Sequence, residues 1–214
     1  QTVVPEAMGS ESEGEEFITD LPDLSKYNVI GVGPGIGLEK QTQNILKLLI
    51  QNAQTPLVLD ADALNILSEN KTWLSFLPSD SILTPHPKEF ERLVGKWSSD
   101  EERLELQQNF SLKHNVYLVL KGANTSITTP LGNVFFNTTG NPGMATGGSG
   151  DVLTGIVTSL LAQGYHPQEA AVLGVYLHGL AGDVAKENNT EYAMIASDII
   201  ESLPLAFGWL QKAV

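Results

Sequence analysis

Asn141-Pro142-Gly143-Met144-Ala145-Thr146-Gly147-Gly148-Ser149-Gly150-Asp151 is the most distinctive stretch of this 214-residue chain, because it places four glycines and an aspartate before a helix. The apolar residues that follow have the spacing of one helical face. They are Val152, Leu153, Ile156, Val157, Leu160 and Leu161. Gly164 then supplies the stop that glycine often provides just after a helix. The glycines therefore belong to the N-terminal end of a helix.

The N-terminal end of a helix attracts anions. Its first backbone N–H groups have no partner within the helix, and the aligned peptide dipoles place about half a positive charge there. Glycine lets the backbone approach phosphate oxygens closely. We therefore expect a phosphate to be cradled by Gly147, Gly148, Ser149 and Gly150. Asp151 would repel this phosphate unless it takes a proton from an attacking hydroxyl, and the alternative is that it only caps the helix.

Upstream of this stretch, four short apolar runs alternate with helical patterns, which is typical of a parallel sheet. The predicted strands cover residues 28–32, 56–59, 81–83 and 115–120. A hairpin is predicted over residues 126–129 and 133–136, and helices over residues 98–113, 167–187 and 196–210. In the last two helices, we expect His178 to be a core or supporting residue and Trp209 to anchor the packing. The pattern predicts an α/β fold with a mostly parallel central sheet flanked by helices.

Each predicted parallel strand ends in residues that suit a ligand site, and the carboxyl ends of parallel strands meet at one edge of a sheet. The first strand ends in Gly33-Pro34-Gly35-Ile36-Gly37, which lacks the spacing of the dinucleotide fingerprint and which a tight turn would also explain. The second ends in Asp60 and Asp62, the third in His86 and the fourth in Lys121.

These residues have structural alternatives. Asp60 and Asp62 can coordinate Mg²⁺, or they can cap the helix that follows. His86 lies between two prolines on a rigid loop, where it can contact a ligand or be structural. Lys121 can reach a phosphate as a point charge, or it can lie at the surface. Together, a glycine anion site, a lysine, possible Mg²⁺ ligands and a carboxylate base indicate phosphoryl transfer to a hydroxyl.

Composition narrows the class of protein. The 12 Lys and Arg residues against 25 Asp and Glu residues give a formal net charge of −13, which argues against nucleic-acid and anionic-membrane partners. The chain has no cysteine, so it has no disulfide framework and no thiolate nucleophile. No apolar run approaches the roughly 20 residues of a membrane span. We expect one cytoplasmic domain over residues 1–214, beginning with a solvated acidic loop over residues 1–26.

The chain also resembles a known family, the ADP- or ATP-dependent NAD(P)H-hydrate dehydratases, which are a branch of the ribokinase-like superfamily. The matching motifs occur in family order over almost the whole chain. They lie at residues 33–37, 59–64, 83–90, 120–122, 141–155 and 161–164.

This resemblance implies a ribokinase-like three-layer sandwich and a carbon–oxygen lyase. Such an enzyme restores NADH or NADPH from its hydrate while it cleaves ADP or ATP, with Mg²⁺ bound to the nucleotide. The hydrate's hydroxyl would be phosphorylated with Asp151 as general base, and phosphate would then leave. Relatives tend to form homo-oligomers, so the resemblance implies one here.

The site residues of the family carry over onto matching positions of this chain. The resemblance assigns the nucleotide to Lys121, Gly122, Ala123, Asn124, Thr125 and Gly150. It assigns the hydrate to Gly35 or Gly37, His86 and Asp151.

The chain departs from the family pattern at its N-terminal end, where the first strand-and-helix crossover is not found. We therefore expect a complete nucleotide half and an incomplete hydrate half. Two other functions stay open. One is a ribokinase-like kinase for a small alcohol, which would make a stable phosphoester, and the other is a nucleotide-binding module without catalysis.

Overall fold

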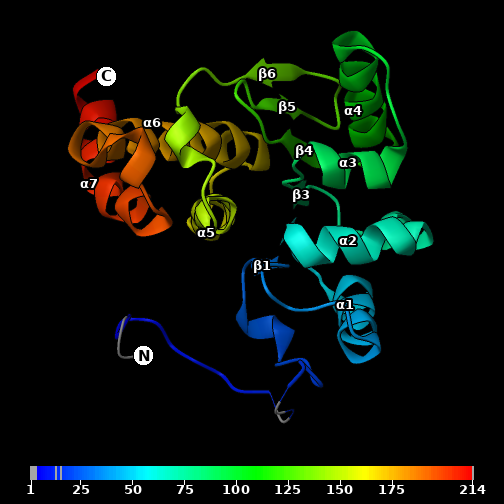
Figure 1. The fold of residues 1–214 in the computed structure, drawn as a ribbon. Helices are drawn as coiled ribbons and strands as arrows, with labels where there is room; N and C mark the ends of the chain where they lie inside the picture. The colour runs from blue at the N-terminus through cyan, green and yellow to red at the C-terminus, as the bar shows by residue number, and fades with distance from the viewer. Residues whose placement is uncertain (1–3, 13, 15, 214) are drawn as a thin grey trace.

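The described part of the chain folds into a single sheet with helices on both sides. The structure is a computed structural model that describes residues 4–12, 14 and 16–213. Its six-stranded sheet has the strands in chain order, β1 (Ile30–Val32), β2 (Leu57–Leu59), β3 (Ile82–Leu83), β4 (Tyr117–Leu120), β5 (Ser126–Thr128) and β6 (Val134–Phe136) (Figure 1). Strands β1 to β4 are parallel, and β5 and β6 add an antiparallel hairpin. The prediction of a mostly parallel sheet is therefore confirmed.

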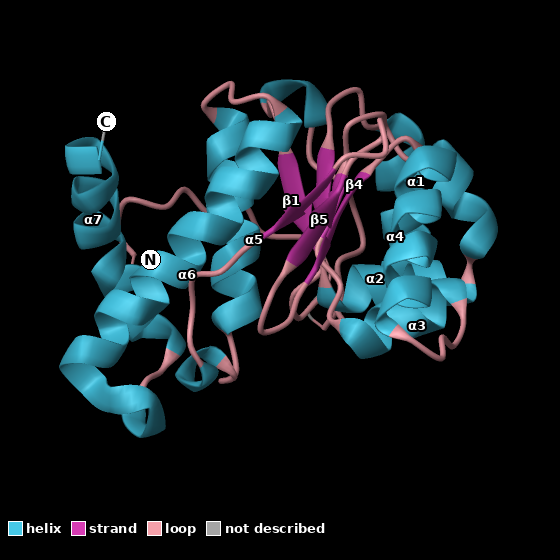
Figure 2. Cartoon of the chain, turned by 90° about the horizontal axis from the view of Figure 1, so that it is seen from above, coloured by secondary structure: helices cyan, strands magenta, loops and turns pink. Residues whose placement is uncertain are grey.

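The helices form two layers around this sheet, as Figure 2 shows. One layer consists of α1 (Lys40–Asn52), α2 (Ala61–Glu69), α3 (Pro87–Val94) and α4 (Asp100–His114). The other consists of α5 (Ser149–Ala162) and α6 (Pro167–Ala193), with α7 (Ala196–Ala213) packed on them. Short 3₁₀ turns occur at η1 (Leu24–Lys26), η2 (Lys71–Phe76) and η3 (Pro142–Met144).

Alternation along the strands explains the two layers. In β2, Leu57 and Leu59 join the core formed with α1 to α4, whereas Val58 joins the core formed with α5 and α6. All three side chains are fully buried. Because successive side chains of a strand point to opposite faces, a continuous apolar run requires cover on both sides. The sheet is therefore held at a fixed place between the helices, and its carboxyl edge becomes a rigid platform.

Several predicted bounds were wrong at the C-terminal end. Helix α6 continues to Ala193 across a break at Thr190, whose φ of 62° lies in the left-handed region. Helix α7 extends to Ala213. Trp209 is 44% exposed, so it is not the packing anchor that its size suggested. At the other end, the described residues before Leu24 form no helix or strand, as expected, and Glu13 and Glu15 lie outside the described residues.

Within the described ranges, no helix is long and apolar enough to cross a bilayer.

Candidate active site

The first turn of α5 leaves backbone donors free. The helix begins at Ser149, and its N-cap residue Gly148 has a φ of 86°, which glycine adopts without strain. Gly148 provides no side-chain cap. Among the described residues, the N–H groups of Gly150 and Asp151 have no acceptor. An anion at this helix end would therefore meet unpaired donors and the positive end of the helix dipole.

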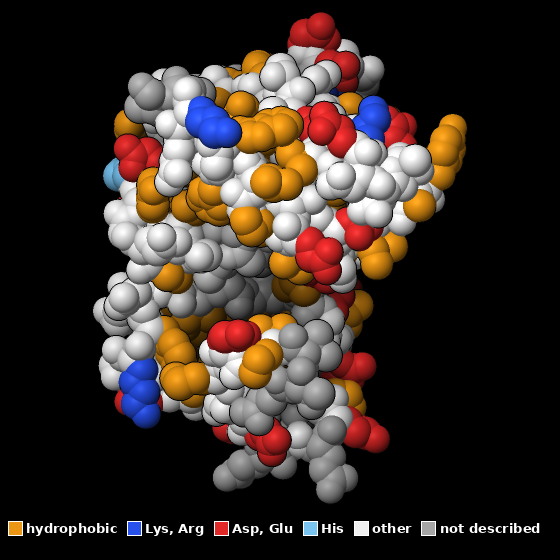
Figure 3. Space-filling model, turned by 90° about the vertical axis from the view of Figure 1, so that its left-hand side faces the viewer, with side chains coloured by type: hydrophobic (Ala, Val, Ile, Leu, Met, Phe, Trp, Pro, Cys, Tyr) orange, Lys and Arg blue, Asp and Glu red, His pale blue; other side chains and the backbone are white. Residues whose placement is uncertain are grey.

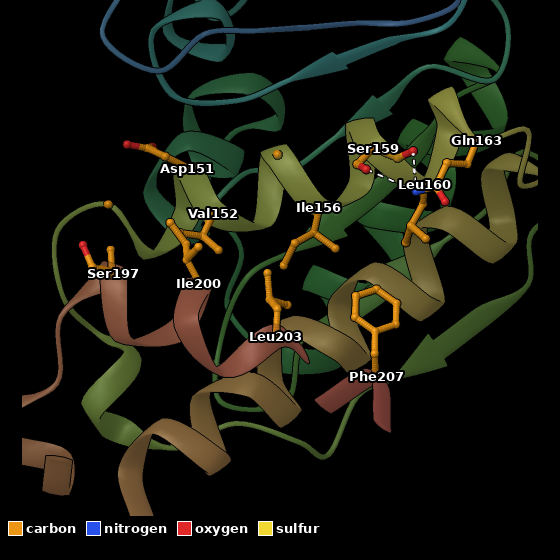
Figure 4. Close-up of a pocket in the computed structure, with 13 residues that line it drawn as sticks. Asp151, Val152, Ile156, Ser159, Leu160, Gln163, Ser197, Ile200, Leu203 and Phe207 are labelled. Atoms are coloured by element: carbon orange, nitrogen blue, oxygen red, sulfur yellow. Dashed lines mark hydrogen bonds between the residues drawn. The ribbon is translucent and has the colours of Figure 1, made fainter. Parts of the chain in front are cut away.

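Asp151 is the third residue of α5 and is exposed. The N-cap position belongs to Gly148, so Asp151 does not cap the helix. Figure 4 shows its carboxylate at the N-terminal end of α5, pointing away from the apolar side chains of Val152 and Ile156. Among the described residues, no group donates a hydrogen bond to this carboxylate, so it is available to a ligand.

A cavity of about 690 Å³ lies on one side of this helix end. It is bounded by the start of α3, the loop after β4, the loop around η3, the first turn of α5 and the middle of α6. Of the residues predicted for the site, those that line it are His86, Lys121, Gly122, Ala123, Thr125, Ser149 and Gly150. Asn124, Gly147, Gly148, Gly35, Gly37 and Asp151 do not line it.

A second hollow of about 540 Å³ lies on the other side, between α5 and α7. Its walls are mostly apolar, with Ile156, Leu203 and Phe207 among them, and Asp151 lies at its end (Figure 4). Gly148 also lines it. Figure 3 shows hydrophobic side chains gathered around a hollow on the face of the molecule that carries α7. Asp151 therefore lies at the end of the apolar groove, whereas its neighbour Gly150 lines the cavity of about 690 Å³.

The Lys121 ammonium is fixed beside the first turn of α5. Its Nζ lies 2.7 Å from Oδ1 of Asp60, which is 1% exposed. Asp60 also caps α2, because its side chain accepts a hydrogen bond from the N–H of Ala61. The capping alternative for Asp60 is therefore confirmed, and Lys121 is a paired cation at the cavity wall.

The prediction that Asp60 and Asp62 hold Mg²⁺ does not fit this arrangement. Both Asp60 oxygens accept hydrogen bonds from protein donors, and Oδ2 of Asp62 accepts a 3.0 Å bond from the N–H of Gly37. In the part of the chain that the structure describes, no group of three or more His, Asp and Glu side chains could hold a metal ion. Asp62 instead ties the glycine loop after β1 to the first turn of α2.

His86 forms the N-cap of α3, with Pro87 as the first helical residue. Its Nδ1 accepts hydrogen bonds from the N–H groups of Lys88 and Glu89, and Oε2 of Glu89 accepts the N–H of His86 in return. Burial lowers the pKa of His86, and the neighbouring Glu89 opposes that shift. Because Nδ1 is an acceptor, Nε2 carries the proton of the neutral ring. The ring also lines the cavity, so its structural and ligand-contact interpretations are compatible.

Helix α6 contributes two contacts that the sequence analysis did not predict. Asp183 accepts hydrogen bonds from the Gly140 N–H (2.9 Å) and the Asn141 side chain (3.0 Å), which anchors the loop around η3. His178 lines the cavity, and its Nε2 lies 3.3 Å from the hydroxyl of Ser149. Helical spacing reports which face of α6 is buried but not which loop it meets, so neither contact could be found from the sequence.

Burial lowers the pKa of His178 to about 4, and this predicts a specific loss of stability in acid. Above its ordinary pKa near 6.5 the imidazole is neutral in both states. As the pH falls below that value, His178 binds a proton in the unfolded chain but stays neutral in the folded chain, so the free energy of unfolding decreases. We expect a loss between pH 7.5 and pH 5 that is about 2 kcal/mol larger than in His178→Gln.

Urea unfolding of both proteins at the two pH values measures this difference. The carboxylates and the other histidines titrate in both proteins, so they cancel in the comparison. Equal losses would show that His178 is readily protonated in the folded chain.

Comparison with known proteins identifies the relatives of this chain. The family model of NAD(P)H-hydrate dehydratase matches residues 1–205. A bifunctional NAD(P)H-hydrate repair enzyme from Moorella thermoacetica is 43% identical over 196 residues, which are 91% of this chain but only 37% of that protein. The chain therefore spans well under half the length of that relative.

Two solved structures resemble the fold closely. One is the ADP/ATP-dependent NAD(P)H-hydrate dehydratase from Bacillus subtilis, co-crystallised with ATP and Mg²⁺ and soaked with CoA. It matches 97% of this chain and 75% of its own, with a TM-score of 0.77 and 28% identity. The other, a ribokinase-like superfamily protein from Enterococcus faecalis, matches 85% of this chain and 63% of its own, with a TM-score of 0.73 and 36% identity.

The predicted three-layer, ribokinase-like architecture is thus confirmed, and so is the resemblance on which it was based. The family match extends over all six strands and over the segments that contain the glycine loops, Lys121 and Asp151. The chain belongs to the NAD(P)H-hydrate dehydratase family.

Proposed function

We propose that this chain restores NADH or NADPH from its hydrate at the expense of ADP or ATP. One observation carries the proposal. Asp151, an exposed carboxylate without a structural partner, follows directly on the unpaired donors of the α5 N-terminus. An anion site needs no carboxylate beside it, whereas phosphoryl transfer to a hydroxyl needs a base there.

The nucleotide is assigned to the cavity of about 690 Å³. Its phosphates would accept hydrogen bonds from the N–H groups of Gly150 and Asp151 and from the Lys121 ammonium. The loop after β4 supplies Gly122, Ala123, Asn124 and Thr125, and Thr125 braces this loop through hydrogen bonds with Gly122. Gly147, Gly148 and Ser149 complete the predicted nest. Donors held in place before the ligand arrives need no reorganisation when charge develops.

The hydrate is assigned to Asp151, Gly35, Gly37 and His86, of which His86 lies on the wall of the cavity of about 690 Å³. Asp151 takes the proton of the hydrate's hydroxyl, and the hydroxyl oxygen attacks the terminal phosphorus of the nucleotide. The bond from that phosphorus to the leaving nucleotide breaks, so ADP would leave as AMP. Phosphate then departs with the electrons of the carbon–oxygen bond. A proton leaves the neighbouring ring carbon, and the ring double bond returns.

Magnesium has no role that this chain's residues define. Both Asp60 oxygens and one Asp62 oxygen accept hydrogen bonds from protein donors, so we assign the ion to the nucleotide alone and derive no step through it.

Three further proposals come from composition and family resemblance. The chain would be one domain, would act in the cytoplasm and would form homo-oligomers. The absence of cysteine from the sequence suits a reducing compartment. Light scattering after size-exclusion chromatography tests the oligomer, because a mass equal to that of one 23.0 kDa chain would contradict it.

Absorbance at 340 nm tests the function. Purified protein is mixed with NADH hydrate and Mg²⁺, with ADP or ATP in separate cuvettes, and a rise identifies both the reaction and its nucleotide. Phosphoester that accumulates from small alcohols without a rise at 340 nm would favour a kinase. Nucleotide binding without turnover of any substrate would favour a binding module.

A further inference from the structure

Asp60 lies where five elements meet, namely β1, β2, β4, α2 and α5. It stands at the end of β2, and its N–H donates to the carbonyl of Val32, at the end of β1. Its Oδ1 accepts from the ammonium of Lys121, at the end of β4 (2.7 Å), and from the N–H of Ala61 (2.8 Å). Its Oδ2 accepts from the hydroxyl of Thr154 in α5 (2.9 Å). A side chain with 1% exposure and this many donors has one available orientation.

The ion pair lies directly against the helix end that is assigned to phosphate. A Cβ placed on Gly150 would be 3.3 Å from Lys121 Nζ and 3.6 Å from Asp60 Oδ2. Of the described residues that line the cavity, Lys121 is the one Lys or Arg. Its ammonium has three N–H donors, and Asp60 takes one of them. The others are left for a ligand at the first turn of α5.

A lysine ammonium sits on four rotatable bonds, so a free one would lose rotamer entropy when it binds a phosphate. Asp60 removes that loss in advance, because it holds the ammonium while the cavity is still open to solvent. Asp60 also offsets the charge of Lys121. The pair would therefore bind an anion through the fixed position and direction of the Lys121 N–H donors more than through net positive charge.

We propose that Asp60 is a positioning residue for phosphate transfer, which fixes the Lys121 ammonium against the first turn of α5. This rests on the proposed function in one respect, namely that Lys121 contacts a nucleotide phosphate. The consequence is that Lys121 contributes to nucleotide affinity only while Asp60 is present. If Asp60 acted only by neutralising Lys121, removal of its charge would have the opposite effect, since an unpaired ammonium attracts phosphate more strongly.

A double-mutant cycle with ADP, measured by calorimetry, separates these effects. We expect Lys121→Met to raise the Kd of ADP about tenfold in the wild-type background but less than about twofold in Asp60→Asn. An equal or larger effect of Lys121→Met in Asp60→Asn would overturn the proposal. Thr154→Val is the matched control, because it removes one hydrogen bond to Asp60 and keeps the ion pair. In that background Lys121→Met should again cost close to tenfold.

A measurement without ligand distinguishes failure of this proposal from failure of the proposed function. An ammonium held in a hydrogen bond exchanges slowly enough to give a ¹H–¹⁵N signal, which Lys121→Met assigns. We expect this signal in the wild type and in Thr154→Val, and its loss in Asp60→Asn. Its persistence in Asp60→Asn would refute the positioning role even if ADP does not bind. If circular dichroism shows Asp60→Asn to be unfolded, Asp60→Glu replaces it, since the longer side chain keeps the charge but displaces the ammonium.

Discussion

Replacing Asp151 with asparagine is expected to lower the turnover of NADH hydrate about 10³-fold, while the Kd of ADP changes less than about threefold. Asparagine has nearly the same shape as aspartate but cannot accept a proton at neutral pH. The backbone donors of Gly150 and of residue 151 itself remain, and so does the glycine N-cap. Single-turnover absorbance at 340 nm and ADP calorimetry measure the two quantities on one preparation.

Glu187→Gln is the matched control for this substitution. Glu187 is likewise an exposed carboxylate on a helix, but it lies in α6 and lines neither cavity. It should leave both turnover and ADP binding unchanged. Turnover by Asp151→Asn within tenfold of the wild type would show that another group takes the proton. Loss of ADP binding would show instead that Asp151 helps to build the nucleotide site.

The second large effect is on stability. Gly33→Ala should reduce the free energy of unfolding by at least about 3 kcal/mol. Gly33 has a φ of 140°, and a Cβ there would lie 1.8 Å from the carbonyl oxygen of Asp60. This contact is between two backbones at the ends of β1 and β2, so no side chain can rotate to relieve it. The strand end must move, and urea unfolding measures the cost.

Gly35→Ala, two residues away, separates crowding from backbone strain. Gly35 also has a positive φ, 66°, but no atom lies within 4 Å of its Cβ position. Only the left-handed conformation is then penalised, and the expected loss is about 1 kcal/mol. If both variants lost the same stability, the close approach of Gly33 to Asp60 would not be the cause.

The sequence predicted the sheet because its strands are short apolar runs that end in glycine or polar residues. It also predicted which residues stand at the carboxyl edge, since parallel strands all end there. The sequence did not predict which groups these residues contact. Lys121 and Asp60 are 61 residues apart, and two acidic residues after a strand indicate a metal as readily as a cap. Only the structure shows that the donors on Asp60 come from Lys121 and Thr154.

The helix C-terminal to the site shows the same limit more strongly. Apolar spacing correctly predicts a buried helix beginning at Pro167, but it does not show what His178 and Asp183 contact. Each of these polar side chains has a partner outside the helix. His178 contacts the hydroxyl of Ser149, and Asp183 accepts hydrogen bonds from Gly140 and Asn141. The prediction that Trp209 anchors the packing was wrong because a large aromatic side chain can stay partly exposed to solvent, as Trp209 does.

The uncapped start of α5 bears on how this protein tolerates mutation. A serine or aspartate cap is a common route to a more heat-resistant helix and is worth about 1 kcal/mol. At residue 148 such a substitution would not stabilise the helix, because a side chain would be strained at a φ of 86°. Its oxygen would also occupy the donors that we assign to the nucleotide. The proposed site therefore requires a helix end without a side-chain cap, and bound nucleotide should offset the missing stability as a higher melting temperature.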